Sequence, residues 1–221
     1  MIYFIADTHG DIDRLKRLRL KKTDFLIICG DFGFIWNGDK KEKQLLKKIG
    51  RRRYPVLFID GLHENFGLLS QFPVEEWNGG KTRIISGNLR YLMRGQVFDL
   101  NGEKVFTLGG GWSDDDDDVL GEENRALAVP DLADRDESFQ NLEKHGNKVD
   151  FVASFEPPSK IAGFLSLSRN MREHAKTIAD EVDKRVEFKR WFFGRYHLNK
   201  VIPPRYFAVY NKAVKSNIVL K

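Results

Sequence analysis

Residues 1–11, MIYFIADTHGD, decide the fold of this protein. The apolar and aromatic run Ile2–Ala6 precedes the first charged residue, as in a strand that is buried on both faces. A helical pattern follows directly, because Ile12, Leu15 and Leu18 recur at a spacing of three residues. A buried strand that leads into a helix through a polar loop with a glycine is typical of a parallel α/β sheet.

The same alternation continues through the first third of the chain. Phe25–Cys29 and Val56–Ile59 have the composition of fully buried strands. Between them, apolar residues within 45–49 mark one face of a second helix, which we expect to end at Gly50. This βαβαβ order predicts a parallel sheet at the start of the chain.

The middle and the end of the chain contain shorter patterns. The Asn101-Gly102 pair is typical of a hairpin turn, so the short strands around it predict an antiparallel meander. The strands expected in this meander are Lys81–Ile85, Arg90–Met93, Gln96–Leu100 and Lys104–Leu108. Later we expect helices over Ser138–His145 and Met171–Val182, and strands over Val149–Ala153, Val186–Phe193, Arg205–Tyr210 and Ala213–Leu220. No repeat or linker interrupts the pattern, so one α/β domain with two sheets is expected over residues 1–221.

Composition excludes several classes of protein. The chain has 221 residues, 41% of them hydrophobic, with 17 Phe and 4 Trp, which is too much apolar material for a disordered chain. The longest apolar runs have the length of strands, so we expect no transmembrane helix, and no basic segment precedes the first run as in a signal peptide. The single cysteine, Cys29, cannot form an internal disulfide. This favours a cytoplasmic protein with a buried thiol.

Positive charge is concentrated at the end of the chain. The formal net charge is +5, from 37 Lys and Arg against 32 Asp and Glu. Residues 182–221 hold ten Lys and Arg against two Asp and Glu, so the rest of the chain is slightly acidic. A basic surface can bind nucleic acid, but a solvated charged face is the interpretation that the sequence favours. The mixed basic and aromatic segment Lys189–Phe193 alternates like a core strand.

Aspartate and histidine gather where the expected strands end. The four segments that follow expected strands are Asp7-Thr-His9-Gly-Asp11, Gly30-Asp31, Asp60-Gly-Leu-His-Glu-Asn65 and Gly194-Arg-Tyr-His197. Because ligands of open α/β sheets bind at the carboxyl ends of parallel strands, we expect these side chains to converge. A mixture of carboxylate and imidazole ligands suits Mn, Fe or Zn and leaves positions open for water, as in hydrolytic metal sites.

This ordered series resembles the calcineurin-like metallophosphoesterase family. Its motifs are Asp-x-His, Gly-Asp, Gly-Asn-His-Glu/Asp, a later single His, and Gly-His-x-His, and the resemblance covers nearly the whole chain. It implies a four-layer αββα sandwich of two mixed sheets flanked by helices. It also implies a two-metal centre that activates water for in-line attack on phosphorus, with a histidine that assists the leaving group.

The resemblance implies that one metal site is retained. The ligands of the family's first site match Asp7, His9, Asp31 and His197. These residues imply room for one divalent ion.

The ligands that belong only to the second site are missing. Leu62 stands at the Asn position, Arg195 at the first His of the last motif, and Phe155, or alternatively Ser154, at the single His. The other histidines, His145 and His174, lie in expected helices away from the strand ends. The second metal site is therefore predicted to be absent.

Three residues carry the predicted chemistry beside the metal: His63, Asp31 and Arg195. His63 occupies the family's general-acid position, where Asp11 would orient it or lie nearby; alternatively it is a polar remnant held by hydrogen bonds. The Arg195 guanidinium would replace the charge of the second metal and pair with Asp31 or a phosphate oxygen. The alternative is a salt bridge from Arg195 to Asp31 in a metal-free pocket.

Two main functions follow. The first is a metal-dependent phosphoesterase whose hydrolysis is weak or lost, acting on a phosphate ester. The second is a pseudo-phosphoesterase that binds a phosphorylated ligand, a nucleic acid or a protein without turnover; a scaffold with a vestigial pocket is a third reading. The run Asp114–Asp118 fits either a hard cation or a solvated loop. We expect no membrane partner, and the sequence leaves the substrate and the oligomeric state open.

Overall fold

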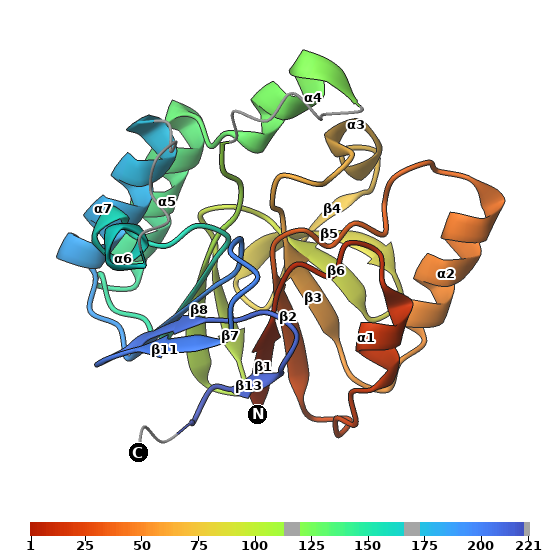
Figure 1. Ribbon diagram of the computed structural model, residues 1–221, viewed down its shortest axis with the longest axis horizontal. Helices are drawn as coiled ribbons and strands as arrows, with labels where there is room; N and C mark the ends of the chain where they lie inside the picture. Colours follow the sequence, from red (N-terminus) through yellow and green to blue (C-terminus); the bar gives the residue numbers. More distant parts are fainter. Residues whose placement is uncertain (113–119, 166–172, 219–221) are drawn as a thin grey trace.

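The structure of the protein is a computed structural model that describes residues 1–112, 120–165 and 173–218 (Figure 1). Within these residues, two mixed β-sheets lie face to face, and helices cover the outer face of each sheet. The protein therefore has the expected αββα order of layers. The expected run Asp114–Asp118 and the start of the expected helix at Met171 lie outside the described residues.

The first sheet has the strand order β13-β1-β2-β3-β6-β5-β4 among the described residues. Its parallel centre consists of β1 (Ile2–Ile5), β2 (Phe25–Cys29), β3 (Val56–Ile59) and β6 (Leu89–Leu92). Its antiparallel edges are β13 (Val214–Lys215) on one side, and β5 (Gly80–Ser86) followed by β4 (Val74–Trp77) on the other. The predicted strands Phe25–Cys29 and Val56–Ile59 are confirmed to the residue.

The second sheet has the order β11-β12-β10-β9-β8-β7 in the same described ranges. Its parallel strands are β8 (Glu103–Leu108), β9 (Phe151–Ser154), β10 (Arg190–Phe193) and β12 (Tyr206–Ala208). The antiparallel edges are β7 (Val97–Leu100) and β11 (Lys200–Ile202). Both sheets thus present a set of parallel carboxyl ends, which is where ligands of α/β proteins bind.

Helices cover the outer faces of the two sheets. On the first sheet lie α1 (Ile12–Lys16), α2 (Lys40–Gly50) and α3 (Phe66–Leu69), and on the second lie α5 (Leu132–Lys144), α6 (Ser159–Phe164) and α7 (Glu173–Arg185). The short α4 (Gly121–Ala128) lies beside α3. Asp11, Asp39 and Asn65 each accept a backbone N–H at the start of a helix, which explains why these helices begin there. No helix within the described ranges is both long and apolar enough to cross a membrane.

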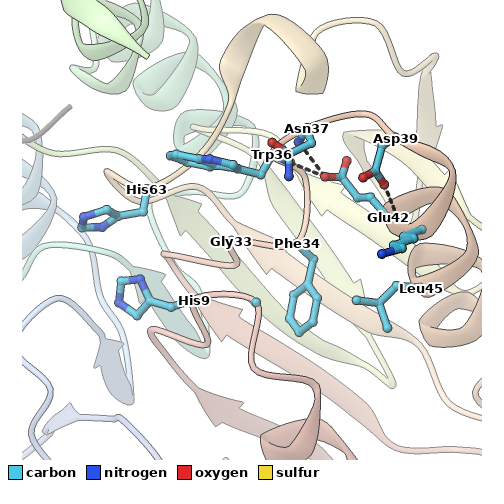
Figure 2. A pocket seen from close by; sticks show the side chains of 11 residues that line it. His9, Gly33, Phe34, Trp36, Asn37, Asp39, Glu42, Leu45 and His63 are labelled. Atoms are coloured by element: carbon cyan, nitrogen blue, oxygen red, sulfur yellow. Dashed lines mark hydrogen bonds between the residues drawn. The ribbon is translucent and has the colours of Figure 1, made fainter. Parts of the chain in front are cut away.

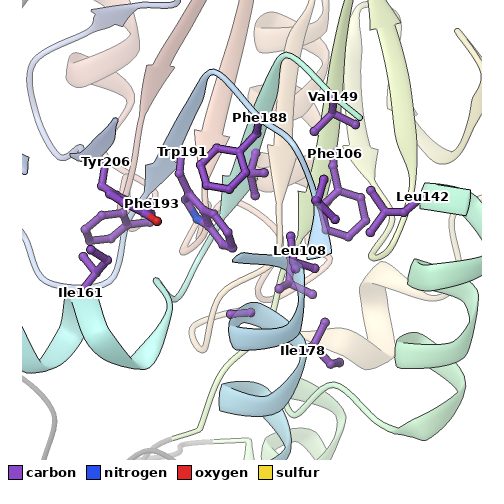
Figure 3. Close-up of a cluster of buried hydrophobic side chains, with 14 of the residues drawn as sticks. Phe106, Leu108, Leu142, Val149, Ile161, Ile178, Phe188, Trp191, Phe193 and Tyr206 are labelled. Atoms are coloured by element: carbon purple, nitrogen blue, oxygen red, sulfur yellow. The ribbon is translucent and has the colours of Figure 1, made fainter. Parts of the chain in front are cut away.

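Aromatic side chains hold the layers together. Between the sheets, Phe4 of β1 stacks on Phe192 of β10, with ring centroids 3.8 Å apart and the rings nearly parallel. Outside the second sheet, Trp191 and Phe106 pack with residues of α5 and α7 (Figure 3). The contact between Phe4 and Phe192 brings the ends of β1 and β10 to the same edge of the molecule.

The middle of the chain differs from the predicted meander. The hairpin at Asn101-Gly102 is confirmed, with φ of 60° and 81° at its two turn residues. The continuous meander is wrong, because β6 belongs to the first sheet and β7 to the second. The chain crosses between the layers at this point, and both strands are buried, so alternation alone could not distinguish one sheet from two.

Candidate metal centre

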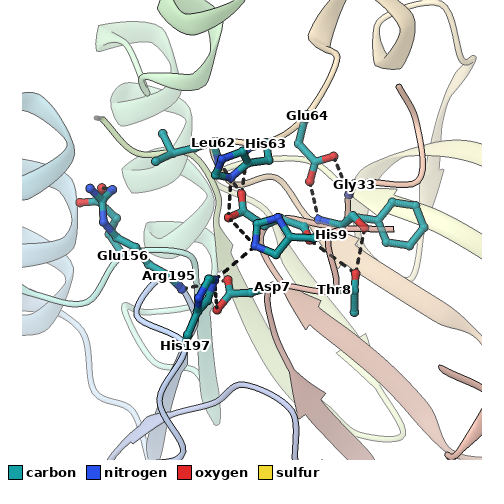
Figure 4. Close-up of polar contacts among 12 residues, drawn as sticks. Asp7, Thr8, His9, Gly33, Leu62, His63, Glu64, Glu156, Arg195 and His197 are labelled. Atoms are coloured by element: carbon teal, nitrogen blue, oxygen red, sulfur yellow. Dashed lines mark hydrogen bonds and ion pairs between the residues drawn. The ribbon is translucent and has the colours of Figure 1, made fainter. Parts of the chain in front are cut away.

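The candidate site lies where four parallel strands end (Figure 4). Asp7 and His9 follow β1, Asp31 follows β2, His63 follows β3, and His197 follows β10. The first three strands are neighbours in one sheet, and β10 belongs to the other. The backbone N–H of Arg195 donates to Asp7 Oδ1 at 3.1 Å, which joins the two sheets at the site. The predicted convergence of strand ends is confirmed.

Two imidazoles, of His9 and His63, lie beside the Asp31 carboxylate. His63 Nδ1 lies 3.0 Å from Asp31 Oδ2, and His9 Nε2 lies 3.7 Å from the same oxygen. One ligand atom from each of these three residues falls within 4.8 Å of the others, a spacing that could hold a metal ion. His197 Nε2 lies 3.2 Å from His9 Nε2, so a fourth side chain lies next to this group.

The backbone at the site is strained. Asp7, His9, Asp31, Arg195 and His197 all have a positive φ, between 44° and 70°. Non-glycine residues in this region cost about 1 kcal/mol or more each, so the surrounding structure must hold them there. This conformation turns each side chain out of its strand toward the shared edge. Strain of this kind is typical of functional sites.

The two sides of the Asp31 carboxylate have different partners. Oδ1 accepts the backbone N–H groups of Leu62 at 2.7 Å and of His63 at 2.9 Å, while Oδ2 faces the imidazoles. Burial would raise the pKa of Asp31, but the hydrogen bonds and charge of His63 outweigh it and lower that pKa. Asp31 is therefore held as a carboxylate, the form that ligates a metal.

The surroundings of the Asp7 carboxylate show most clearly that these residues would accept a cation. Its side chain is buried, Oδ1 accepts the Arg195 N–H, and Oδ2 has no hydrogen-bond partner. Oδ2 lies 3.9 Å from His197 Nε2. Burial, together with the nearby Asp31 charge, raises the pKa of Asp7 to about 7. Burying a carboxylate oxygen without a hydrogen-bond partner is unfavourable in free energy, and a bound cation would offset this. The Asp7 oxygen and the imidazoles beside it therefore fit a divalent ion.

His9 has the protonation state that a metal ligand needs. Burial lowers the pKa of the His9 imidazole below its ordinary value, and His63 and His197 add to the shift, although Asp31 opposes it. A neutral imidazole offers a lone pair to a metal, whereas a protonated one repels it.

An apolar ring stands beside the metal centre. Phe155 is buried, and its ring lies against Gly30, where an added Cβ would be only 2.1 Å from Phe155 Cδ2. The Ser154 side chain instead lies on the outer side of the second sheet, since its Oγ donates to the Glu156 carbonyl at 2.7 Å and accepts the Trp191 indole N–H at 2.7 Å. Of the two residues left open by the sequence, Phe155 is therefore the one that lies next to the site.

The expected salt bridge from Arg195 to Asp31 is wrong. The Arg195 guanidinium pairs with the buried Glu156 carboxylate, and its Nη2 donates to the Trp112 carbonyl at 2.7 Å. The reason is that Glu156 directly follows Phe155 at the end of β9, next to β10. Gly111 allows this approach, because an added Cβ there would lie 2.5 Å from Glu156 Oε1. Sequence reasoning missed Glu156; its only signal was a carboxylate beside the position of the missing histidine.

The remaining predicted residues lie outside the centre. Asp11 caps α1 by accepting the Asp13 N–H at 2.9 Å and is not bonded to His63 in the described structure. His145 ends α5 near Lys104, at the start of β8 and hence at the opposite end of the sheet. The side chain of His174 lies outside the described structure. Neither Asp11 nor His145 joins the metal-binding group.

Arg14 supports the site, although no sequence pattern indicates this role. Its guanidinium donates to the carbonyls of Asp7, Ala6 and Tyr210, and its Cζ lies 4.7 Å from the Tyr210 ring centroid. On the same tyrosine, the His197 ring stacks at 4.9 Å between centroids. Arg14 thus holds the backbone of one expected ligand and, through Tyr210, the ring of another.

Two face-to-face mixed sheets with an Asp/His group at their shared strand ends define a metallophosphoesterase-like domain. The family model described as calcineurin-like phosphoesterase matches residues 1–198. The protein therefore belongs to the calcineurin-like phosphoesterase family, as its motifs indicate. The matched region includes every residue of the candidate centre.

Curated proteins and solved structures give no more specific assignment than the family. The sequence matches none of the curated proteins with which it was compared. One similar solved structure is the crystal structure of a protein of unknown function from Aquifex aeolicus, with 14% sequence identity, 85% of this chain and 87% of that chain covered, and a TM-score of 0.33.

Proposed function

We propose that the protein is a phosphoesterase that uses one divalent ion, Mn, Fe or Zn, and hydrolyses phosphate esters slowly. The observation that supports this most is the chain of contacts among four side chains at the strand ends. His9 Nε2 lies 3.7 Å from Asp31 Oδ2 and 3.2 Å from His197 Nε2, which in turn lies 3.9 Å from the buried Oδ2 of Asp7. These four residues would hold the ion. When bound, such an ion offsets charge on phosphoryl oxygens and lowers the pKa of a coordinated water.

His63 is the proposed general acid. Asp31 engages its Nδ1 at 3.0 Å, which orients the ring and directs Nε2 to the other side. The side chain is 59% exposed, so a substrate can approach it from solvent. A proton held on this ring can pass to the leaving-group oxygen of an ester bound at the rim. Asp31 would thus serve as a ligand and as the group that positions the acid.

We do not assign the Arg195 side chain to binding the phosphate of the substrate. Its guanidinium is engaged by Glu156 and the Trp112 carbonyl, so its charge is balanced inside the protein. Its backbone N–H still fixes Asp7 Oδ1. We therefore assign Arg195 as a positioning residue. Because this pair and Phe155 lie beside a single retained metal site, half of a two-metal clamp is missing and the rate should be low.

Metal binding and turnover test the proposal together. The protein is treated with EDTA, titrated with Mn²⁺ by calorimetry, and assayed with p-nitrophenyl phosphate and bis-p-nitrophenyl phosphate. We expect one Mn²⁺ per chain and slow turnover, and Asp31→Asn should remove both. Asp136→Asn, which changes an exposed aspartate on α5, is the matched control. A protein that binds no Mn²⁺ and hydrolyses neither ester would overturn the proposal.

A pseudo-phosphoesterase is the second candidate. The side chains at the positions of the second-site ligands favour it, because Phe155 and Leu62 offer no ligand atom and the Arg195 guanidinium is a cation paired with Glu156. In that case the protein would bind Mn²⁺ and phosphate but release no product. The same assay distinguishes the two functions, since only the enzyme turns over an ester.

Nucleic acid has weaker support as a partner. Several basic residues of the C-terminal segment have structural partners: Lys189 pairs with Asp150, Arg190 donates to the Ser216 and Ile218 carbonyls, and Arg205 stacks on Phe188. These contacts leave less of the basic surplus for a phosphate backbone. A phosphate ester of low molecular mass is therefore the proposed substrate.

The buried thiol of Cys29 supports a cytoplasmic location, and the core shared by both sheets supports a single domain over residues 1–221.

A further inference from the structure

A cavity of about 540 Å³ opens beside the metal centre (Figure 2). His9 and His63 lie at one end, and the remaining walls come mainly from the loop between β2 and α2, with Phe34, Trp36 and Asn37, and from the first half of α2. The volume falls within the range of small-molecule sites, about 300–1,000 Å³. Nothing in the proposed chemistry at the metal uses this space, so it is available for the organic part of a substrate.

The loop that forms the cavity is fixed in place. The Glu42 carboxylate, on α2, accepts the backbone N–H groups of Trp36 at 2.8 Å, Asn37 at 2.7 Å and Gly38 at 3.1 Å. The Trp36 carbonyl accepts the Asn65 side-chain amide at 2.8 Å. Trp36 is thus held by hydrogen bonds on both sides of its backbone. The cavity is largely formed before a ligand arrives, which lowers the entropic cost of binding.

Trp36 and Phe34 give the walls an aromatic part, beside the charged side chains of Asp39, Lys41 and Glu42. Figure 2 shows the Trp36 indole on one side of the cavity, the Phe34 ring and Leu45 on the other, and the two histidines at one end. Phe34 is buried, whereas Trp36 is only partly buried. Among the described residues, the Trp36 ring neither stacks on another ring nor donates a hydrogen bond through its indole N–H. A large aromatic face is therefore presented to the cavity without a partner.

We propose that this cavity binds a planar aromatic group of the substrate, a nucleobase or another aryl ring, stacked on Trp36 while the phosphate lies between His9 and His63. The proposal rests on the proposed function, because it takes the phosphate position from the metal centre. Stacking tolerates any flat ring, since every such ring offers a π face. The exposed Asn37 amide at the rim adds a hydrogen-bonding group of the kind that reads base edges.

Calorimetry with three phosphate monoesters tests the proposal in the presence of Mn²⁺. The ligands are adenosine 5′-monophosphate, phenyl phosphate and ribose 5-phosphate, which carries the same sugar phosphate without a base. Both aromatic esters should bind at least about tenfold tighter than ribose 5-phosphate. A further preference for adenosine 5′-monophosphate identifies a nucleobase as the ring, and equal affinity of the two identifies a general aryl site.

Variants assign the preference to Trp36. Trp36→Leu should bring the three affinities within about threefold of one another, while Trp36→Phe keeps a ring and should retain most of the preference. Trp77→Phe, on the edge strand β4, is the matched control and should leave the affinities unchanged. Circular dichroism verifies that each variant is folded. Equal binding of all three esters by the unaltered protein, binding of none, or an unchanged preference in Trp36→Leu would overturn the proposal.

The outcome separates this inference from the proposed function. Slow turnover of esters without an aromatic preference would refute the aromatic site and leave the phosphoesterase intact. An aromatic preference that depends on Trp36, without turnover of any ester, would establish the binding site in a protein that is not an enzyme.

Discussion

The guanidinium of Arg195 and the carboxylate of Glu156 form a salt bridge where β10 and β9 end. Both side chains are mostly buried, with 16% and 4% of their surfaces exposed. The pair is neutral as a whole and stands beside Phe155, whose ring centroid lies 5.8 Å from Arg195 Cζ. Arg195 therefore brings no unbalanced positive charge to the metal centre, in contrast to what its position in the motif predicts.

A double-mutant cycle measures the interaction free energy of Arg195 and Glu156. Removing one partner leaves the other charge buried, so Arg195→Met and Glu156→Gln should each lower the free energy of unfolding by about 3 kcal/mol. The double variant should cost at least about 2 kcal/mol less than the sum of the two, because neither charge is left behind. Urea denaturation gives the three values. Simple additivity would show that the two residues are not coupled.

Asp7→Asn should stabilise the metal-free protein at pH 8. The raised pKa means that folding favours the protonated Asp7, so stability present near pH 4 is lost as the pH rises toward about 7. Asparagine removes the buried charge and should add about 1–3 kcal/mol above pH 7, with little change near pH 4. Thermal unfolding in EDTA across this pH range measures the effect.

In Mn²⁺ we expect the opposite order of stability, with the unaltered protein more stable than Asp7→Asn. In excess Mn²⁺ the unaltered protein gains stability from binding, and Asp7→Asn should gain much less because it has lost a ligand. If the asparagine variant is less stable than the unaltered protein in EDTA at pH 8, burial does not destabilise the Asp7 carboxylate and the prediction is wrong.

Arg14→Met tests the support of the site from outside. The substitution removes donors from three backbone carbonyls and should cost about 2–3 kcal/mol of stability. Mn²⁺ affinity should also fall about tenfold, because Asp7 and His197 both lose their support. Arg17→Met changes an exposed arginine at the end of the same helix and should alter neither quantity. Lost stability with unchanged Mn²⁺ affinity would mean that Arg14 is purely structural.

Much of the site could be predicted from the sequence, because the sequence shows where the buried strands end. The buried runs before Asp7, Asp31 and His63 have a clear composition, and parallel strands place their carboxyl ends together. Those three residues and His197 could therefore be grouped without a structure.

Other parts of the site depend on packing that no local pattern encodes. Glu156 is an ordinary residue before two prolines, and it becomes the partner of Arg195 only because β9 lies beside β10. In the sequence, Trp36 cannot be distinguished from an aromatic residue of the core. Only in the structure do Glu42 and Asn65 hold its backbone at the edge of a cavity. The placement of β6 and β7 in separate sheets likewise rests on long-range packing of two buried strands.

Restoring the missing ligands is the most direct test of how the second site was lost. The combined change Leu62→Asn, Phe155→His and Arg195→His returns the family's ligand types to positions beside Asp31. We expect calorimetry to show two Mn²⁺ per chain instead of one. Glu156 loses the Arg195 guanidinium in this variant, so stability should fall by about 3 kcal/mol unless the second ion offsets the buried charge. Adding Glu156→Gln should recover part of that loss without changing the number of ions. A folded variant that still binds one Mn²⁺ would show that Phe155 or Leu62 does not stand where a ligand is needed.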